Sequence, residues 1–84
     1  MNRDEIKAAL LQQIGNIAPE ADLSKLDPAV DFREELDIDS IGFLNLVIAL
    51  AEQLRIPIPE KDYPRLRTIE SALSYLTAAT QRIA

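Results

Sequence analysis

The chain has 84 residues, enough for one domain with a small core. It contains neither cysteine nor histidine, which excludes disulfides, thiol nucleophiles and the commonest general base and transition-metal ligands. With 48% hydrophobic residues, 5% aromatic residues and a net charge of −5, the composition favours aliphatic helices and disfavours a nucleic-acid binder.

We expect residues 1–84 to form a single domain that is monomeric and cytoplasmic. The first residues are charged, and no apolar run approaches the roughly 20 residues that cross a bilayer, so neither a signal peptide nor a membrane span is predicted. Charge is uneven along the chain. Residues 1–42 hold ten acids and four bases, whereas residues 43–84 hold four acids and five bases.

Residues 2–18 are predicted to form a helix that Pro19 ends, with Asn2 and Glu5 at the spacing of a capping box. Its apolar stripe comprises Ile6, Leu10, Leu11, Ile14 and Ile17. From Pro19 to Asp39 we expect a long ordered loop, because turn-forming residues alternate with apolar side chains that would pin it to a core. Those side chains are Leu23, Leu26, Val30, Phe32, Leu36 and Ile38.

A second helix should begin with Asp39 as its N-cap and run to about Leu54, because Pro57 and Pro59 forbid continuation. One of its faces is formed by Phe43, Val47, Leu50 and Leu54. A neighbouring face, formed by Ile41, Leu44 and Ile48, is also apolar. A small protein would find it hard to bury both faces, so the second is a candidate contact surface.

After Pro59 there is room only for a short helical turn, which Pro64 should interrupt. A final helix is predicted to start with Thr68 as N-cap. Its helical apolar spacing includes Ile69, Ala72, Leu73, Leu76, Ala79 and Ile83. The predicted fold is an all-α four-helix bundle, with three long helices, one short third helix and a long ordered loop between helices 1 and 2.

No catalytic constellation is apparent. Residues 31–39 hold five acids against Arg33, but nothing in their spacing places two carboxylates across a pocket, so a solvated acidic surface is predicted. The segment from Asp37 to Gly42 resembles the start of a calcium loop. A complete calcium loop would need oxygen ligands at the positions of Ile41 and Ile48, so no dedicated metal site is expected.

Ser40 lies in the predicted first turn of the second helix. By itself, Asp-Ser before an apolar run indicates an ordinary helix start. A phosphodiester on this hydroxyl would also be favoured there, because free amide N–H groups and the helix dipole stabilise negative charge. Ser40 is therefore a candidate for modification.

The sequence here resembles the acyl carrier protein family. Asp39-Ser40-Ile41 is similar to the family's Asp-Ser-Leu attachment motif, and Ile58-Pro59-Glu60 resembles the Ile-Pro-Asp that precedes its third helix. Residues 66–76 (LRTIESALSYL) resemble the start of its last helix, and the likeness covers residues 2–80. The resemblance implies a non-enzymatic carrier with 4'-phosphopantetheine on Ser40, between Asp39 and Ile41, attached from coenzyme A by a separate transferase with Mg²⁺.

The resemblance also implies roles for other residues. Asp37, Asp39 and Glu52, with the outward Ile41, Leu44 and Ile48, correspond to a surface that docks on basic patches of the transferase and of acyl-loading and acyl-processing enzymes. The cargo pocket corresponds to Phe43, Val47, Tyr63 and Leu66. Phe43 and Tyr63 are larger than the family pattern, which suggests a narrow pocket and a cargo that is short, polar or not sequestered. The alternative is that the two rings simply fill a core poor in aromatic residues.

Two positions depart from the carriers of fatty acid biosynthesis. Gly42 and Asn45 stand where those carriers have acids, which favours a specialised lipid or secondary-metabolite pathway. One alternative is an aminoacyl or peptidyl carrier with the same arm, although these usually resemble Gly-Gly-His-Ser at the attachment site. Another is an unmodified helical protein–protein interaction domain in which Ser40 is only a cap. A small DNA-binding domain would need a basic recognition helix, which is missing.

Overall fold

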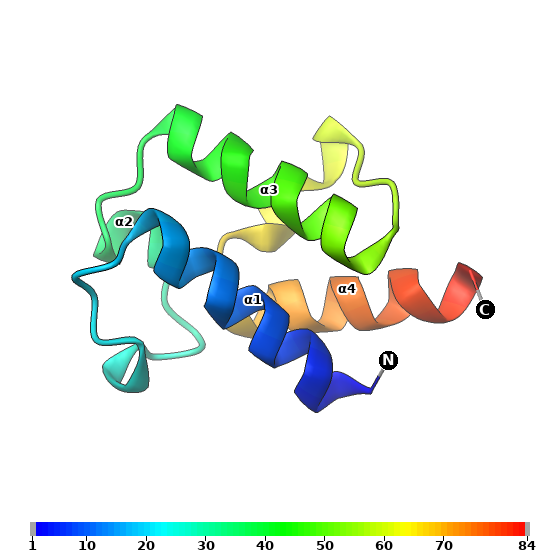
Figure 1. The fold of residues 1–84 in the computed structure, drawn as a ribbon, viewed down its shortest axis with the longest axis horizontal. Helices are drawn as coiled ribbons and strands as arrows, with labels where there is room; N and C mark the ends of the chain where they lie inside the picture. Colours follow the sequence, from blue (N-terminus) through cyan, green and yellow to red (C-terminus); the bar gives the residue numbers. More distant parts are fainter. Residues whose placement is uncertain (1, 84) are drawn as a thin grey trace.

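The computed structural model describes the backbone of residues 2–83 and the side chains of residues 2–81; the two ends of the expected 1–84 domain, residues 1 and 84, lie outside the described residues. Its elements, in chain order, are α1 (Arg3–Ile17), η1 (Leu23–Lys25), α2 (Phe32–Glu35), α3 (Ser40–Leu54), η2 (Glu60–Leu66) and α4 (Ile69–Ile83) (Figure 1). The three long helices and the all-α fold are confirmed. Within residues 2–83, no helix combines the length and the apolar character that crossing a bilayer requires.

Helix α1 begins where its capping box predicts. The side chain of Asn2 accepts a hydrogen bond from the Glu5 amide at 2.8 Å, and the Glu5 carboxylate accepts one from the Asn2 amide at 3.3 Å. Together these bonds satisfy amide groups that the first turn of a helix leaves free. The buried face of α1 consists of Ile6, Ala9, Leu10 and Ile14.

The segment from Pro19 to Asp39 is a long ordered connection, as predicted, and it also contains two short helical elements that were not predicted, η1 and α2. Asp22 caps η1 by accepting from the Ser24 amide, and Asp31 caps α2 by accepting from the first amides of that helix. Both elements are too short to display a helical apolar period, which is why the sequence pattern did not reveal them. The predicted pinning is confirmed at Phe32 and Ile38, which are buried.

Pro64 does not interrupt the short third helix, contrary to expectation. Seven residues, Glu60–Leu66, form the 3₁₀ helix η2 with Pro64 inside it. The fixed φ of proline, about −65°, lies within the 3₁₀ range, so the ring is compatible with this backbone. Helix α4 then starts after Thr68, whose hydroxyl accepts from the Ser71 amide at 3.0 Å, as predicted for an N-cap.

The core lies where the three long helices meet. Helix α1 packs against both α3 and α4, and η2 packs against α4 (Figure 1). Helix α3 contributes the buried face that was predicted, now completed by Leu46. Because this face holds α3 against the core, the first turn of α3 is fixed at one end of the bundle, next to α2.

Candidate functional site

A tight turn between α2 and α3 positions the start of α3. The Asp37 amide donates to the Glu34 carbonyl at 3.2 Å, and the Ile38 amide donates to the Arg33 carbonyl at 2.9 Å. Asp37 has a φ of 53°, in the left-handed region. This bonding pattern is the Schellman motif, which ends a helix and reverses the chain. It directs Ile38 into the core and brings the chain back past Arg33.

Ser40 is the first residue of α3, and its side chain is exposed. Asp39 is the predicted N-cap, and its carboxylate accepts from the Gly42 amide at 2.7 Å. On either side of this pair, Ile38 is buried and Ile41 is 72% exposed. The hydroxyl of Ser40 is therefore held at a fixed helix start and remains open to another protein.

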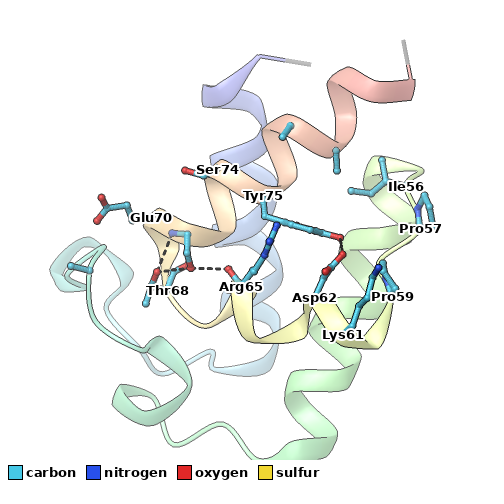
Figure 2. Close-up of a pocket in the computed structure, with 14 residues that line it drawn as sticks. Ile56, Pro57, Pro59, Lys61, Asp62, Arg65, Thr68, Glu70, Ser74 and Tyr75 are labelled. Atoms are coloured by element: carbon cyan, nitrogen blue, oxygen red, sulfur yellow. Dashed lines mark hydrogen bonds between the residues drawn. The ribbon is translucent and has the colours of Figure 1, made fainter.

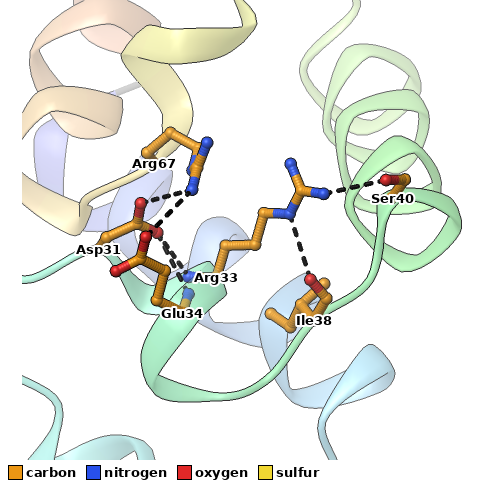
Figure 3. A network of polar contacts seen from close by, with 6 residues as sticks. All are labelled: Asp31, Arg33, Glu34, Ile38, Ser40 and Arg67. Atoms are coloured by element: carbon orange, nitrogen blue, oxygen red, sulfur yellow. Dashed lines mark hydrogen bonds and ion pairs between the residues drawn. The ribbon is translucent and has the colours of Figure 1, made fainter.

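Arg33 contacts Ser40 directly, which the sequence did not predict. Its Nη2 atom donates to Ser40 Oγ at 3.0 Å, and its Nε atom donates to the Ile38 carbonyl at 3.1 Å (Figure 3). The guanidinium carbon lies 5.2 Å from the centre of the Phe43 ring. The available signal was that Arg33 is the one base within residues 31–39. Its meeting with Ser40 depends on the turn at Asp37.

A second arginine, Arg67, neutralises acids of α2 and of its cap. Its Nη2 atom lies 2.7 Å from Asp31 Oδ2 and 4.0 Å from Glu34 Oε1 (Figure 3). Burial raises the pKa of the Asp31 carboxyl, but the hydrogen bond and charge of Arg67 and two amides of α2 outweigh burial and hold that pKa below its ordinary value. Asp31 is therefore a structural carboxylate, which holds the start of α2 beside Arg67, just before α4.

The predicted docking residues lie on the outer side of α3 and at its start. Ile41, Leu44 and Ile48 are exposed by 72%, 43% and 46%, so the second apolar face of α3 is unburied, as predicted. Asp37 and Glu52 are also exposed. Apolar side chains flanked by acids on one helix can bind a partner that offers apolar contacts and positive charge.

The predicted pocket residues lie on the inner side of α3 and in η2. Phe43, Val47 and Leu66 are buried, and Tyr63 is half-buried. The rings of Phe43 and Tyr63 meet edge to face, with centroids 6.3 Å apart. The ring contact joins α3 to η2, and Val47 and Leu66 belong to the same core cluster.

Two surface cavities lie outside the predicted pocket, and the smaller one includes the predicted docking residues Asp37 and Asp39 in its lining. The larger, about 1050 Å³, is an open groove between η2 and α4, where the Tyr75 hydroxyl donates to Asp62 Oδ2 at 2.7 Å and Arg65 lies over the Tyr75 ring (Figure 2). The smaller, about 460 Å³, lies beside the turn that includes Asp37. Among the residues that the structure describes, no three potential ligand side chains gather to hold a metal ion.

Comparison with known proteins agrees with this geometry. Residues 4–76 match the sequence model of a family described as "Phosphopantetheine attachment site". An acyl carrier protein of Rubrobacter xylanophilus is 33% identical over 79 residues, covering 90% of this chain and 93% of the relative. Acyl carrier proteins of Renibacterium salmoninarum (33% over 81 residues, 93% and 95%) and Acidothermus cellulolyticus (29% over 80 residues, 95% and 94%) are similar over comparable lengths.

Proposed function

Because the chain belongs to the acyl carrier protein family, we propose that Ser40 is the residue that carries its covalent 4'-phosphopantetheine. The chain is a carrier and not an enzyme. The main observation that supports this proposal is the exposed side chain of Ser40, the first residue of α3, within the segment that matches the attachment family.

The other serines support this assignment by contrast. The sequence holds four serines, all within the described residues. The hydroxyl of Ser24 donates to Asp22, and that of Ser71 donates to the Arg65 carbonyl at 2.7 Å. Ser74 lies within the body of α4, away from a helix start. Ser40 is the serine that combines exposure with free helix amides, which favour the negative charge of a phosphodiester.

The residues around Ser40 suit modification by a separate transferase. Attachment forms a bond between Ser40 Oγ and phosphorus and breaks the pyrophosphate bond of coenzyme A. Adenosine 3',5'-bisphosphate leaves, and the hydroxyl proton is released. Among the described side chains of residues 2–81, Ser40 Oγ bonds to Arg33, which is a donor and not a base, and this agrees with a separate transferase whose own base takes that proton. The arm then supplies the thiol that a cysteine-free chain lacks, and acyl groups are carried on it as thioesters.

The transferase and the acyl-loading and acyl-processing enzymes would dock on the outer side of α3. Ile41, Leu44 and Ile48 offer apolar contact area. Asp37, Asp39 and Glu52 surround them with negative charge, which complements a basic patch and speeds encounter. The exposure of the three apolar residues supports this role, because exposed apolar patches commonly mark surfaces that bind another protein.

The departures from the family pattern support a proposal for the cargo and the pathway. Gly42 and Asn45 remove negative charge from the docking side of α3, which favours partners in a specialised lipid or secondary-metabolite pathway over those of bulk fatty acid synthesis. Phe43 and Tyr63 meet edge to face in the core cluster that also holds Val47 and Leu66, which supports a narrow pocket. The carrier would therefore hold short or polar cargo, or leave a long chain outside the bundle.

Intact mass tests the attachment site. The purified apo protein is incubated with coenzyme A, Mg²⁺ and a promiscuous phosphopantetheinyl transferase, beside Ser40→Ala and the control Ser74→Ala. We expect a gain of roughly 340 Da, the covalent mass of one phosphopantetheine, in the wild type and in Ser74→Ala but not in Ser40→Ala. A wild type that gains no mass with two unrelated transferases would instead be an unmodified interaction domain.

A further inference from the structure

Arg33 is a half-buried cation whose charge no acid of the described chain neutralises. Among the described side chains, those of residues 2–81, the ion pairs involve Lys25 and Arg67, and none involves Arg33. This is unexpected in a segment with five acids, because an arginine there would ordinarily pair with a carboxylate. Asp31 and Glu34 instead form ion pairs with Arg67. The charge of Arg33 therefore remains available to an anion.

The same arginine is held in place on three sides. Its carbonyl accepts the Ile38 amide at 2.9 Å, and its Nε donates to the Ile38 carbonyl at 3.1 Å. The Phe43 ring lies 5.2 Å from the guanidinium carbon, within the range of a cation–π contact. These contacts leave the Nη2 end of the guanidinium pointing at Ser40 Oγ (Figure 3). Little side-chain entropy then remains to be lost when this end binds a ligand.

We propose that Arg33 binds the phosphodiester that Ser40 carries after modification, and so holds the base of the arm on the α2 side of α3. This inference rests on the proposed attachment at Ser40. Modification turns Oγ into an ester oxygen, a weak acceptor, and places charged non-bridging oxygens beside the same Nη2 atom. A guanidinium to phosphate bond, at about 2.7–2.9 Å, is stronger than the bond to a hydroxyl that it would replace.

A cycle of four proteins isolates this contact: apo and holo forms of the wild type and of Arg33→Gln. The bonds of Arg33 to Ile38 and Phe43 are lost equally in both forms of the variant, so they cancel in the apo-to-holo difference. Arg65→Gln is the matched control, because Arg65 also lies over an aromatic ring. Its guanidinium carbon is 5.9 Å from the centre of the Tyr75 ring, in the groove of Figure 2. Arg33→Lys keeps the charge and loses the planar fork.

At low salt, we expect the change in Tm from apo to holo to be about 3 °C more favourable in the wild type than in Arg33→Gln. Arg65→Gln should match the wild type, and Arg33→Lys should fall between. At about 0.5 M salt the advantage should shrink to about half or less, because screening weakens a partly exposed ion pair. In holo protein the ³¹P resonance should be broader and shifted in the wild type relative to Arg33→Gln, a readout that does not depend on stability.

Equal apo-to-holo changes and identical ³¹P spectra in the wild type and Arg33→Gln would overturn the inference. Intact mass, recorded first, separates this failure from failure of the proposed function. If every variant gains phosphopantetheine but the wild type and Arg33→Gln show the same apo-to-holo change, attachment at Ser40 stands and the proposed role of Arg33 is wrong. If the wild type gains no mass, both fall. If Arg33→Gln does not fold, the ³¹P comparison between the wild type and Arg33→Lys decides.

Discussion

Arg67 lies 2.7 Å from Asp31, and this pair joins the cap of α2 to the residues that lead into α4. Backbone contacts reinforce it: the Phe32 amide donates to the Arg67 carbonyl at 2.9 Å, and Asp31 forms an isolated antiparallel bridge with Thr68. Because α2 precedes the turn that leads into α3, these contacts between Asp31, Phe32 and residues 67–68 also fix the position from which Arg33 reaches Ser40.

Asp31→Asn should destabilise the fold at neutral pH by about 1 kcal/mol. Asparagine still caps α2, so the change removes mainly the charge that pairs with Arg67. The folded-state pKa of Asp31 is lowered. Its stabilisation is therefore complete above the unfolded pKa of about 3.9 and is lost as pH falls through the folded-state pKa. Urea unfolding at several pH values should show the two proteins converging in acid.

The matched control for this measurement is Asp22→Asn, which also retains a helix cap. Asp22 pairs with Lys25 at 3.9 Å, but the two side chains are 57% and 84% exposed. Exposed pairs of this kind contribute little, so the control should stay within about 0.5 kcal/mol of the wild type. A gap between wild type and Asp31→Asn that stays constant from neutral to strongly acidic pH would contradict the assignment to charge.

Leu44→Ala combined with Ile48→Ala should weaken docking without unfolding the carrier. Both side chains are almost half exposed, so we expect the free energy of unfolding to change by less than about 1 kcal/mol. The KM of the transferase for the apo carrier should rise about tenfold, equivalent to about 1.4 kcal/mol of lost contact. Steady-state transfer kinetics and urea unfolding measure the two quantities.

Leu46→Ala serves as the opposite case, because Leu46 is 1% exposed on the inner side of α3. Its loss should cost about 2–5 kcal/mol of stability while the KM of the remaining folded protein stays near that of the wild type. If the double surface variant kept the wild-type KM with two different partner enzymes, the outer side of α3 would not be the docking surface.

Asn45→Asp should improve recognition by an acyl-loading enzyme of bulk fatty acid synthesis. Asn45 is exposed on α3, and an acid there would restore charge that this chain lacks on its docking side. We expect kcat/KM to rise about two- to fivefold at low salt, mainly through faster encounter, and the gain to shrink as salt is added. Ser74→Asp adds the same charge on exposed α4 and should give no gain. A similar gain from both variants would indicate nonspecific attraction.

A long acyl chain should remain outside the bundle of the loaded wild type. Phe43, Val47 and Leu66 are 5%, 2% and 0% exposed, and Tyr63 closes on the Phe43 ring. The methyl resonances of Val47 and Leu66 should therefore be nearly the same in butyryl-loaded and palmitoyl-loaded protein. Large shifts of both with the palmitoyl chain would mean that the bundle opens to bury it, and the narrow-pocket proposal would fail.

Phe43→Leu should open this space, at a cost of about 1–2 kcal/mol in stability. In this variant the palmitoyl chain should shift the Val47 and Leu66 methyl resonances. Phe32→Leu is the matched control, because Phe32 is equally buried but lies in α2. It should cost similar stability and leave those resonances unchanged on loading.

The sequence by itself determined the starts of the three long helices, the two apolar faces of α3, and the candidate serine. Asn2, Asp39 and Thr68 cap their helices as predicted, because a cap joins residues only two or three positions apart. The exposure of Leu44 and Ile48 was also predictable, since helical period alone separates the two faces. Such features depend on local geometry that the tertiary structure does not alter.

Only the tertiary structure decided what surrounds Ser40. Arg33 meets it because Asp37 adopts a left-handed conformation that usually belongs to glycine, so the pattern gave no signal of the turn. Arg67 meets Asp31 because α4 packs beside the cap of α2, and no local spacing encodes a contact across so much chain. Both arginines are ordinary charged residues in the sequence; their partners follow from how the helices pack.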